Sequence, residues 1–99
     1  MIVAFVQFRL PTPLSEAAAT QLFEVSTPNY HDLAGLIRKH YVLSEDGHVA
    51  GGLYFWQDRA SGERAYDSQW HSRVYAIYGA EPQITWYNSP VAVVNVGER

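Results

Sequence analysis

The sequence predicts an α+β fold of the ferredoxin-like βαββαβ type with an antiparallel sheet, and three observations support it. Two runs with apolar and aromatic residues at alternate positions, 36–43 and 48–56, flank Ser44-Glu45-Asp46-Gly47, which is typical of a β-hairpin. Segments with helical spacing precede and follow this hairpin, and strand-like runs lie near both ends. The element order β-α-β-β-α-β is that of the split βαβ pattern.

The first strand is predicted over residues 2–9, a β-branched and aromatic run that stops at Leu10-Pro11-Thr12-Pro13. A helix follows, with Thr12 or Ser15 as its cap and apolar residues recurring on one side between positions 18 and 23. Pro28 disfavours helical geometry in the residue before it, so we expect this helix to end near residues 26–27.

Side chains of the central hairpin alternate between the two faces of the sheet. On the first strand we expect one face to hold Leu36, Arg38, His40 and Val42, and the other to hold Ile37, Lys39, Tyr41 and Leu43. On the second strand Gly52, Tyr54 and Trp56 share a face. Neither side has the composition of a solvated surface, so we expect the sheet to be covered on both faces. Gly51 and Gly52 indicate a close backbone approach or a bulge.

The second helical region begins after Asp58 or Ser61, either of which can cap it. Asp67-Ser68 interrupts this region before the helical spacing resumes, and Gly79 is the expected C-cap. Residues 83–87 are predicted as the last strand. The apolar run 91–96 extends that strand past a proline, and we expect it to pair with a partner chain.

Length and composition indicate a single domain, residues 1–99, that forms a homodimer. The chain has 99 residues, of which 47% are hydrophobic and 14% aromatic. A domain of this size buries only about 60–70% of its unfolded surface, so a sheet that is apolar on both faces favours a second subunit as cover.

Charge and targeting signals narrow the class of protein. The net charge of −3 argues against a nucleic-acid-binding role, because affinity for phosphate backbones comes mainly from clustered Lys and Arg. No cysteine is present, so disulfides and thiolate metal sites are excluded. The apolar run at the N-terminus is too short for a signal peptide or a membrane span. We therefore expect a soluble cytoplasmic protein that binds neither nucleic acid nor membrane.

Metal and nucleophile motifs are missing from the sequence. The four histidines, His31, His40, His48 and His71, form no pair with the spacing that places two ligands on one element. No Ser-His-Asp order and no nucleotide-binding glycine motif stands out. We expect no metal site.

Three segments carry a family resemblance. They are Gly35-Leu36-Ile37-Arg38-Lys39-His40-Tyr41, Gly51-Gly52-Leu53-Tyr54-Phe55-Trp56 and Tyr78-Gly79-Ala80-Glu81-Pro82. With Tyr30, they resemble the small monooxygenase family of YdhR type, within the dimeric α+β barrel superfamily that also contains antibiotic-biosynthesis and haem-degrading monooxygenases. The resemblance implies a dimer in which one sheet face meets the partner's sheet. The helix-covered face would then enclose a pocket in each subunit.

The activity implied is that of a monooxygenase that needs no cofactor and combines molecular oxygen with a phenolic or polycyclic aromatic molecule. Such a site needs an apolar pocket, a base or hydrogen-bond donor, and aromatic walls. His40 and Tyr54 are the candidate catalytic residues. The candidate substrate-binding residues are Tyr30, Arg38, Trp56, Trp70 and His71.

Each candidate also has a structural interpretation. His40 also fits a strand histidine that is hydrogen-bonded to a neighbour or faces a dimer interface, and Arg38 and Lys39 each fit one half of a salt bridge with an acidic residue. Tyr54 and Trp56 are compatible with a core position, as is Trp70.

Two further functions fit the same resemblance. One is a dimeric small-molecule-binding or stress-associated module without turnover. The other is haem binding or degradation, for which Gln7, Trp56 and His71 occupy places roughly comparable to the Asn, Trp and His of haem-degrading relatives.

Overall fold

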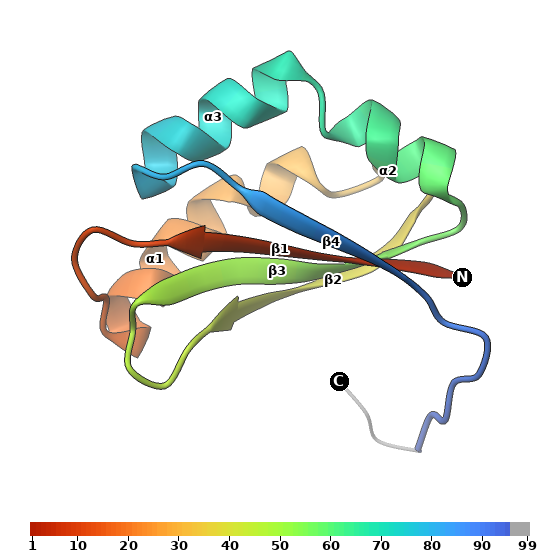
Figure 1. The fold of residues 1–99 in the computed structure, drawn as a ribbon, viewed down its shortest axis with the longest axis horizontal. Coiled ribbons are helices and arrows are strands. Elements are labelled where there is room, and N and C mark those ends of the chain that lie inside the picture. Colours follow the sequence, from red (N-terminus) through yellow and green to blue (C-terminus); the bar gives the residue numbers. More distant parts are fainter. Residues whose placement is uncertain (96–99) are drawn as a thin grey trace.

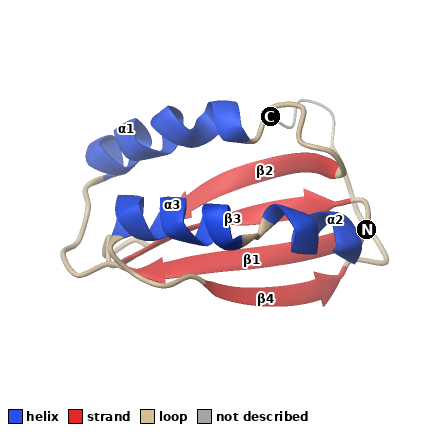
Figure 2. Ribbon diagram, turned by 90° about the horizontal axis from the view of Figure 1, so that it is seen from above, coloured by secondary structure: helices blue, strands red, loops and turns tan. Residues whose placement is uncertain are grey.

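The computed structural model describes residues 1–95 and has the predicted ferredoxin-like element order. Its elements are β1 (Ile2–Arg9), α1 (Glu16–Ser26), the 3₁₀ helix η1 (Thr27–Asn29), β2 (Leu36–Leu43), β3 (Val49–Trp56), α2 (Arg59–Ala65), α3 (Ser68–Tyr78) and β4 (Gln83–Asn88). The strands form one antiparallel sheet in the order β2-β3-β1-β4. The helices lie on one face of this sheet (Figure 1). Figure 2 shows α1 along the β2 edge and α2 and α3 across the middle of the sheet.

Capping residues place the helix boundaries close to where the sequence predicts them. Ser15 caps α1, and its hydroxyl accepts a hydrogen bond from the Ala18 N–H. The second helical region divides at Asp67, whose carboxylate accepts from the Trp70 N–H and starts α3. Gly79 ends α3 in the left-handed conformation with φ 68°, as its assignment as C-cap predicts.

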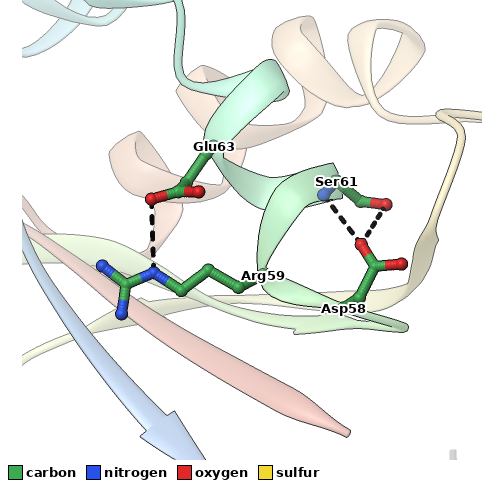
Figure 3. A network of polar contacts seen from close by, with 4 residues as sticks. All are labelled: Asp58, Arg59, Ser61 and Glu63. Atoms are coloured by element: carbon green, nitrogen blue, oxygen red, sulfur yellow. Dashed lines mark hydrogen bonds and ion pairs between the residues drawn. The ribbon is translucent and has the colours of Figure 1, made fainter.

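The start of α2 is fixed by Asp58 (Figure 3). Its Oδ1 accepts hydrogen bonds from the N–H and the hydroxyl of Ser61, both at 2.8 Å. These bonds stabilise the carboxylate and lower the pKa of Asp58. Arg59 and Glu63 form an ion pair at 3.3 Å one turn apart, but both side chains are more than half exposed, so this pair contributes little stability.

The strand register decides which side chains face the helices. Lys39 pairs with Tyr54, and Tyr54 pairs on its other side with Ala4, so these three face the helices. The opposite face, here called the open face, has no covering element within residues 1–95. Its side chains include Val3, Phe5, Gln7, Arg38, His40, Leu53 and Phe55.

One predicted face assignment is wrong. Leu36 pairs with Trp56, but Arg38 pairs with the adjacent Phe55, so Ile37 is an extra residue at a β-bulge. The bulge reverses the alternation at this point. Leu36 therefore packs against the core under the helices, whereas Arg38 faces the open side.

The core lies between the sheet and the helices and is rich in aromatic rings. Trp56, Trp70 and Val6 are its largest fully enclosed side chains. Phe8 on β1 stacks against Tyr78 of α3 with ring centroids 4.4 Å apart, which joins the sheet to the last helix.

Gly51 shows the predicted close backbone approach, and replacing it with alanine should lower the free energy of unfolding by about 1–3 kcal/mol. A Cβ atom here would collide with the Val6 carbonyl oxygen, which is backbone and cannot rotate away. Urea denaturation measures the loss. At Gly52 the first atom met is Lys39 Cε at 3.0 Å, a side-chain atom rather than backbone, so Gly52→Ala is the matched control with a smaller loss. Equal losses would contradict the backbone explanation.

The segment after β4 does not continue as a strand within residues 91–95. Val91, Val93 and Val94 are exposed, at 80%, 84% and 74%. Val96, the end of the predicted extension, lies outside the described residues. Pairing of this segment with a partner chain stays a prediction. No helix in residues 1–95 has the length and apolar character needed to cross a membrane.

Candidate functional site

A cleft opens at the β2 edge of the sheet, between that strand and the segment that follows α1. Its volume is about 380 Å³, which suits a small organic molecule. We call it the edge cleft. Its lining includes Thr27, Tyr30, Asp32, Leu36, Lys39 and Tyr41.

Lys39 is the central polar group of this cleft. Its Nζ lies 3.5 Å from the ring centroid of Tyr41 and 3.7 Å from that of Tyr30. The ring of Tyr54 is 4.7 Å away. Ring faces attract a cationic group through their quadrupole. Within residues 1–95 the ion pair is Arg59–Glu63, so the expected salt bridge to an acidic residue is not formed by Lys39.

Burial among these rings changes the protonation of Lys39. Loss of hydration lowers the pKa of its amine to about 6, and the nearby positive charge of Arg73 adds to this effect. At pH 7 and above the amine is therefore mostly neutral and has a free electron pair. A lysine in this state can act as a base, which a hydrated surface lysine cannot do at that pH.

Tyr30 contributes a positioned hydroxyl group to the edge cleft. Its oxygen accepts hydrogen bonds from Trp70 Nε1 at 3.1 Å and from the Tyr54 hydroxyl at 3.3 Å. Two donors on one phenolic oxygen leave the Tyr30 proton available to donate elsewhere. Tyr30 lines the edge cleft, and it also lines a small enclosed cavity of about 10 Å³ together with Lys39, Tyr54 and Arg73.

The other tyrosines act as neutral walls. The hydroxyl groups of Ser26 and Tyr41 form a hydrogen bond of 2.7 Å, and the Ser26 hydroxyl also lies 2.9 Å from the Phe23 carbonyl oxygen. Burial raises the pKa of Tyr41 and raises that of Tyr54 well above its ordinary value. Neither phenol ionises near neutral pH, so neither is a base in the resting protein.

Tyr54, Trp56 and Trp70 lie on the helix-covered side together with Tyr30, as their assignment to one site requires. Trp56 and Trp70 are only 0% and 2% exposed, so they stand behind the cleft. Trp70 positions Tyr30 through its indole N–H. Trp56 stacks on Tyr54 with an interplanar angle of 2°.

His40 does not share a face with Tyr54, so the structure does not bring the two candidate catalytic residues together. The register pairs His40 with Leu53 on the open face, where its ring lies edge-on to Phe55 at 6.1 Å. Arg38 borders the edge cleft, but its guanidinium lies over Phe55 on the open face at 4.9 Å. His71 contacts Trp70 on α3 and is absent from the cleft lining.

The haem alternative required Gln7, Trp56 and His71 to converge. Gln7 pairs with Gly51 on the open face, whereas Trp56 faces the helices. Gln7 and Trp56 therefore lie on opposite faces of the sheet, and this geometry does not favour a haem that contacts both.

Lys39 is the residue that the sequence reasoning missed, and two signals point to it. It is the only lysine in the 99 residues. It also occupies a position that strand alternation assigns to the same side as Tyr41. Lysine side chains are almost never buried unless they are paired with an opposite charge. A lysine predicted to lie beside aromatic residues on a covered face of the sheet is therefore unusual.

Comparison with known proteins gives the fold. No protein-family model and no curated protein matches the chain. Among solved structures, the Streptomyces coelicolor monooxygenase from the gene ActVA-Orf6, in complex with Nanaomycin D, is 18% identical with a TM-score of 0.70, covering 95% of this chain and 91% of that one.

Two further structures have similar scores. A mutant of SnoaB, a cofactor-independent oxygenase from Streptomyces nogalater, is 14% identical with a TM-score of 0.67, covering 95% of this chain and 98% of its own. The NE2512 protein of unknown function from Nitrosomonas europaea is 17% identical with a TM-score of 0.69. The match covers 97% of this chain and 95% of that one. At this identity the likeness establishes the fold: the chain has the ferredoxin-like α+β fold found in antibiotic biosynthesis monooxygenases.

Proposed function

We propose that this chain is a cofactor-independent monooxygenase that oxidises a phenolic or polycyclic aromatic molecule bound in the edge cleft. The observation that carries the proposal is the group of Lys39 with Tyr30, Tyr41 and Tyr54 beside a cleft of about 380 Å³. The fold shared with a cofactor-independent oxygenase supports it. A subfamily of YdhR type stays a prediction from the sequence.

The chemistry needs few protein groups. An anion of an electron-rich aromatic molecule transfers electrons to molecular oxygen, and one oxygen atom enters the ring as a carbonyl. The second oxygen atom leaves as water with two hydrogens from the substrate, so the reaction balances without an added reductant. The protein's part is to favour the anion, orient its ring and exclude water. Tyrosine rings and a positioned hydroxyl suit these tasks.

Oxygen consumption by the metal-stripped protein tests this function. An anthrone or dihydroxynaphthalene serves as substrate, and heat-denatured protein at the same pH is the blank. Uptake well above the blank supports the proposal. A rise in melting temperature with substrate but without oxygen uptake would instead indicate a binding module without turnover.

Replacing Tyr54 with phenylalanine should reduce oxygen uptake about 10- to 100-fold. The variant keeps the ring but removes the hydrogen bond that holds the Tyr30 hydroxyl, and loss of positioning has effects of this size. Tyr75→Phe is the matched control, because Tyr75 is 51% exposed on α3 and does not line the edge cleft, and its rate should equal that of the wild type. A loss in Tyr75→Phe that equals the loss in Tyr54→Phe would contradict this site assignment.

We further propose that a second copy of the chain covers the open face. Phe5 and Leu53 pair at the centre of that face, and Val3 and Phe55 pair next to them. Contiguous apolar groups on one face mark an interaction surface. The isologous contact of a homodimer fits this arrangement, because one patch then covers its own copy.

Leu53→Glu should convert the homodimer to a monomer, because it places a charge at the centre of the buried patch. Size-exclusion chromatography with light scattering measures the mass. Thr20→Glu, on an exposed position of α1, adds the same charge away from the patch and should stay dimeric. A wild-type mass equal to one chain would refute the dimer.

A further inference from the structure

We propose that Lys39 accepts the proton of an acidic phenol or enol bound in the edge cleft, and that the resulting ammonium group and the Tyr30 hydroxyl hold the anion. This assignment rests on the proposed function, because it takes the edge cleft as the substrate site. It adds a proton acceptor and an anion-binding pair that neither the fold nor the comparisons assign.

The first support is the position of Lys39. Its chain runs over Gly52, where even a Cβ atom would lie 3.0 Å from Lys39 Cε, so the lysine stem is held close to the sheet. Its Nζ then lies among the three tyrosine rings, and Lys39 is one of the residues that line the edge cleft. The amine is therefore both restrained and adjacent to the space that a substrate would fill.

The second support is the set of groups that face Lys39. Arg73 from α3 disfavours a second positive charge beside it. Tyr41 and Tyr54 are neutral at neutral pH, as is Tyr78, whose pKa is raised by burial. The edge cleft beside Lys39 is also lined by Tyr30, His31 and Asp32, and of these His31 and Asp32 are exposed. The resting site thus favours the free amine, whereas an anion bound in the cleft favours the protonated form of Lys39.

The third support is the unused proton of Tyr30. Its oxygen already accepts from Trp70 and Tyr54, so its own O–H is directed by the network and is free to donate. A donor aimed at a developing oxyanion stabilises it more strongly in a water-poor site than in bulk water. The Lys39 Nζ lies 3.7 Å from the centroid of the Tyr30 ring, and both residues line the edge cleft, so the amine and this phenol belong to the same site.

The proton transfer balances without any other reactant. The O–H bond of the phenol or enol breaks and its electron pair stays on oxygen. A new N–H bond forms on the Lys39 electron pair, which gives an ammonium group next to an anion. The anion is the electron-rich species that reacts with oxygen in the proposed function.

A chromogenic phenol tests the assignment without turnover. 4-Nitrophenol absorbs at longer wavelength as its anion, so a pH titration of the bound probe reports its ionisation. With the wild type we expect the bound probe to ionise at least one pH unit lower than the free probe, which is a tenfold stabilisation of the anion. In Lys39→Met this shift should disappear, and in Tyr30→Phe it should shrink.

Lys39→Arg separates charge from proton acceptance. Arginine stays protonated, so the variant should still bind the anion but should lose at least 100-fold in oxygen uptake. Added methylamine should partly restore uptake in Lys39→Ala but not in Lys39→Arg. Circular dichroism confirms that each variant is folded.

The two proposals fail in different ways. An unchanged probe shift in Lys39→Met, or full oxygen uptake in Lys39→Arg, overturns the assignment of Lys39. If the wild type lowers the pH at which bound 4-nitrophenol ionises but consumes no oxygen with any tested substrate, the anion-binding site is supported and the monooxygenase function is overturned.

Discussion

Replacing Trp56 with alanine should lower the free energy of unfolding by about 3–5 kcal/mol, a large part of the total stability of a small domain. Trp56 has 0% exposure. It stacks on Tyr54 with ring centroids 5.9 Å apart, and its Nε1 donates to the Tyr66 hydroxyl at 3.2 Å. Alanine removes the ring, leaves a cavity between the sheet and α2, and leaves a buried hydroxyl without its donor.

Urea denaturation followed by far-ultraviolet circular dichroism measures this loss. Trp56→Phe keeps most of the apolar volume and should lose less than Trp56→Ala. Trp86→Ala is a matched control on the edge strand β4, since Trp86 packs beside the core but is only partly buried. A loss below about 1 kcal/mol for Trp56→Ala would show that the site collapses around the smaller side chain.

The fold was predictable because its signals are local. Ser15, Asp58 and Asp67 cap helices where residue type and spacing indicate, and Gly79 ends α3 as expected. The turn at Asp46-Gly47 sets the hairpin, and Gly47 has φ 78°, which suits glycine. Each signal acts within a few residues, so a single sequence is enough to locate it.

The candidate site was harder to predict because it depends on register and on distant packing. A single bulge residue, Ile37, places Leu36 and Arg38 on different faces, and no local residue type marks it. The register also places His40 on the open face, away from Tyr54. Tyr30 reaches the site through a loop, and only the fold shows that Trp70, 40 residues later, donates to it.

Lys39→Met should raise the free energy of unfolding by about 2–4 kcal/mol at pH 7, because burial of an amine that is protonated in the unfolded chain costs stability. The folded-state pKa of Lys39 is about 6, and the unfolded value is 10.5. Between these values the unfolded chain binds more protons, so this group makes the wild type more stable as pH rises. At pH 6 and below its cost is fully present.

Urea midpoints between pH 6 and 9 measure this prediction. The difference between Lys39→Met and the wild type should be largest at pH 6 and decrease towards pH 9. Methionine has a similar length and no charge, so it keeps most of the packing against the tyrosine rings. Arg9→Met, on an exposed side chain at the end of β1, is the control that removes a charge without relieving burial. A constant difference across this pH range would show that Lys39 is not neutral in the folded protein.

The predicted stability gain has a consequence for function. The one lysine of this chain is buried among three tyrosine rings without an ion pair in residues 1–95, so the wild type should be less stable than a variant with an apolar side chain at this position. Residues that lower stability in this way are typical of sites whose chemistry needs them. If Lys39→Met is both more stable and unable to ionise a bound phenol, the lysine is retained for its proton chemistry. If it is more stable and binds the anion unchanged, the cost has another cause and Tyr30 alone holds the anion.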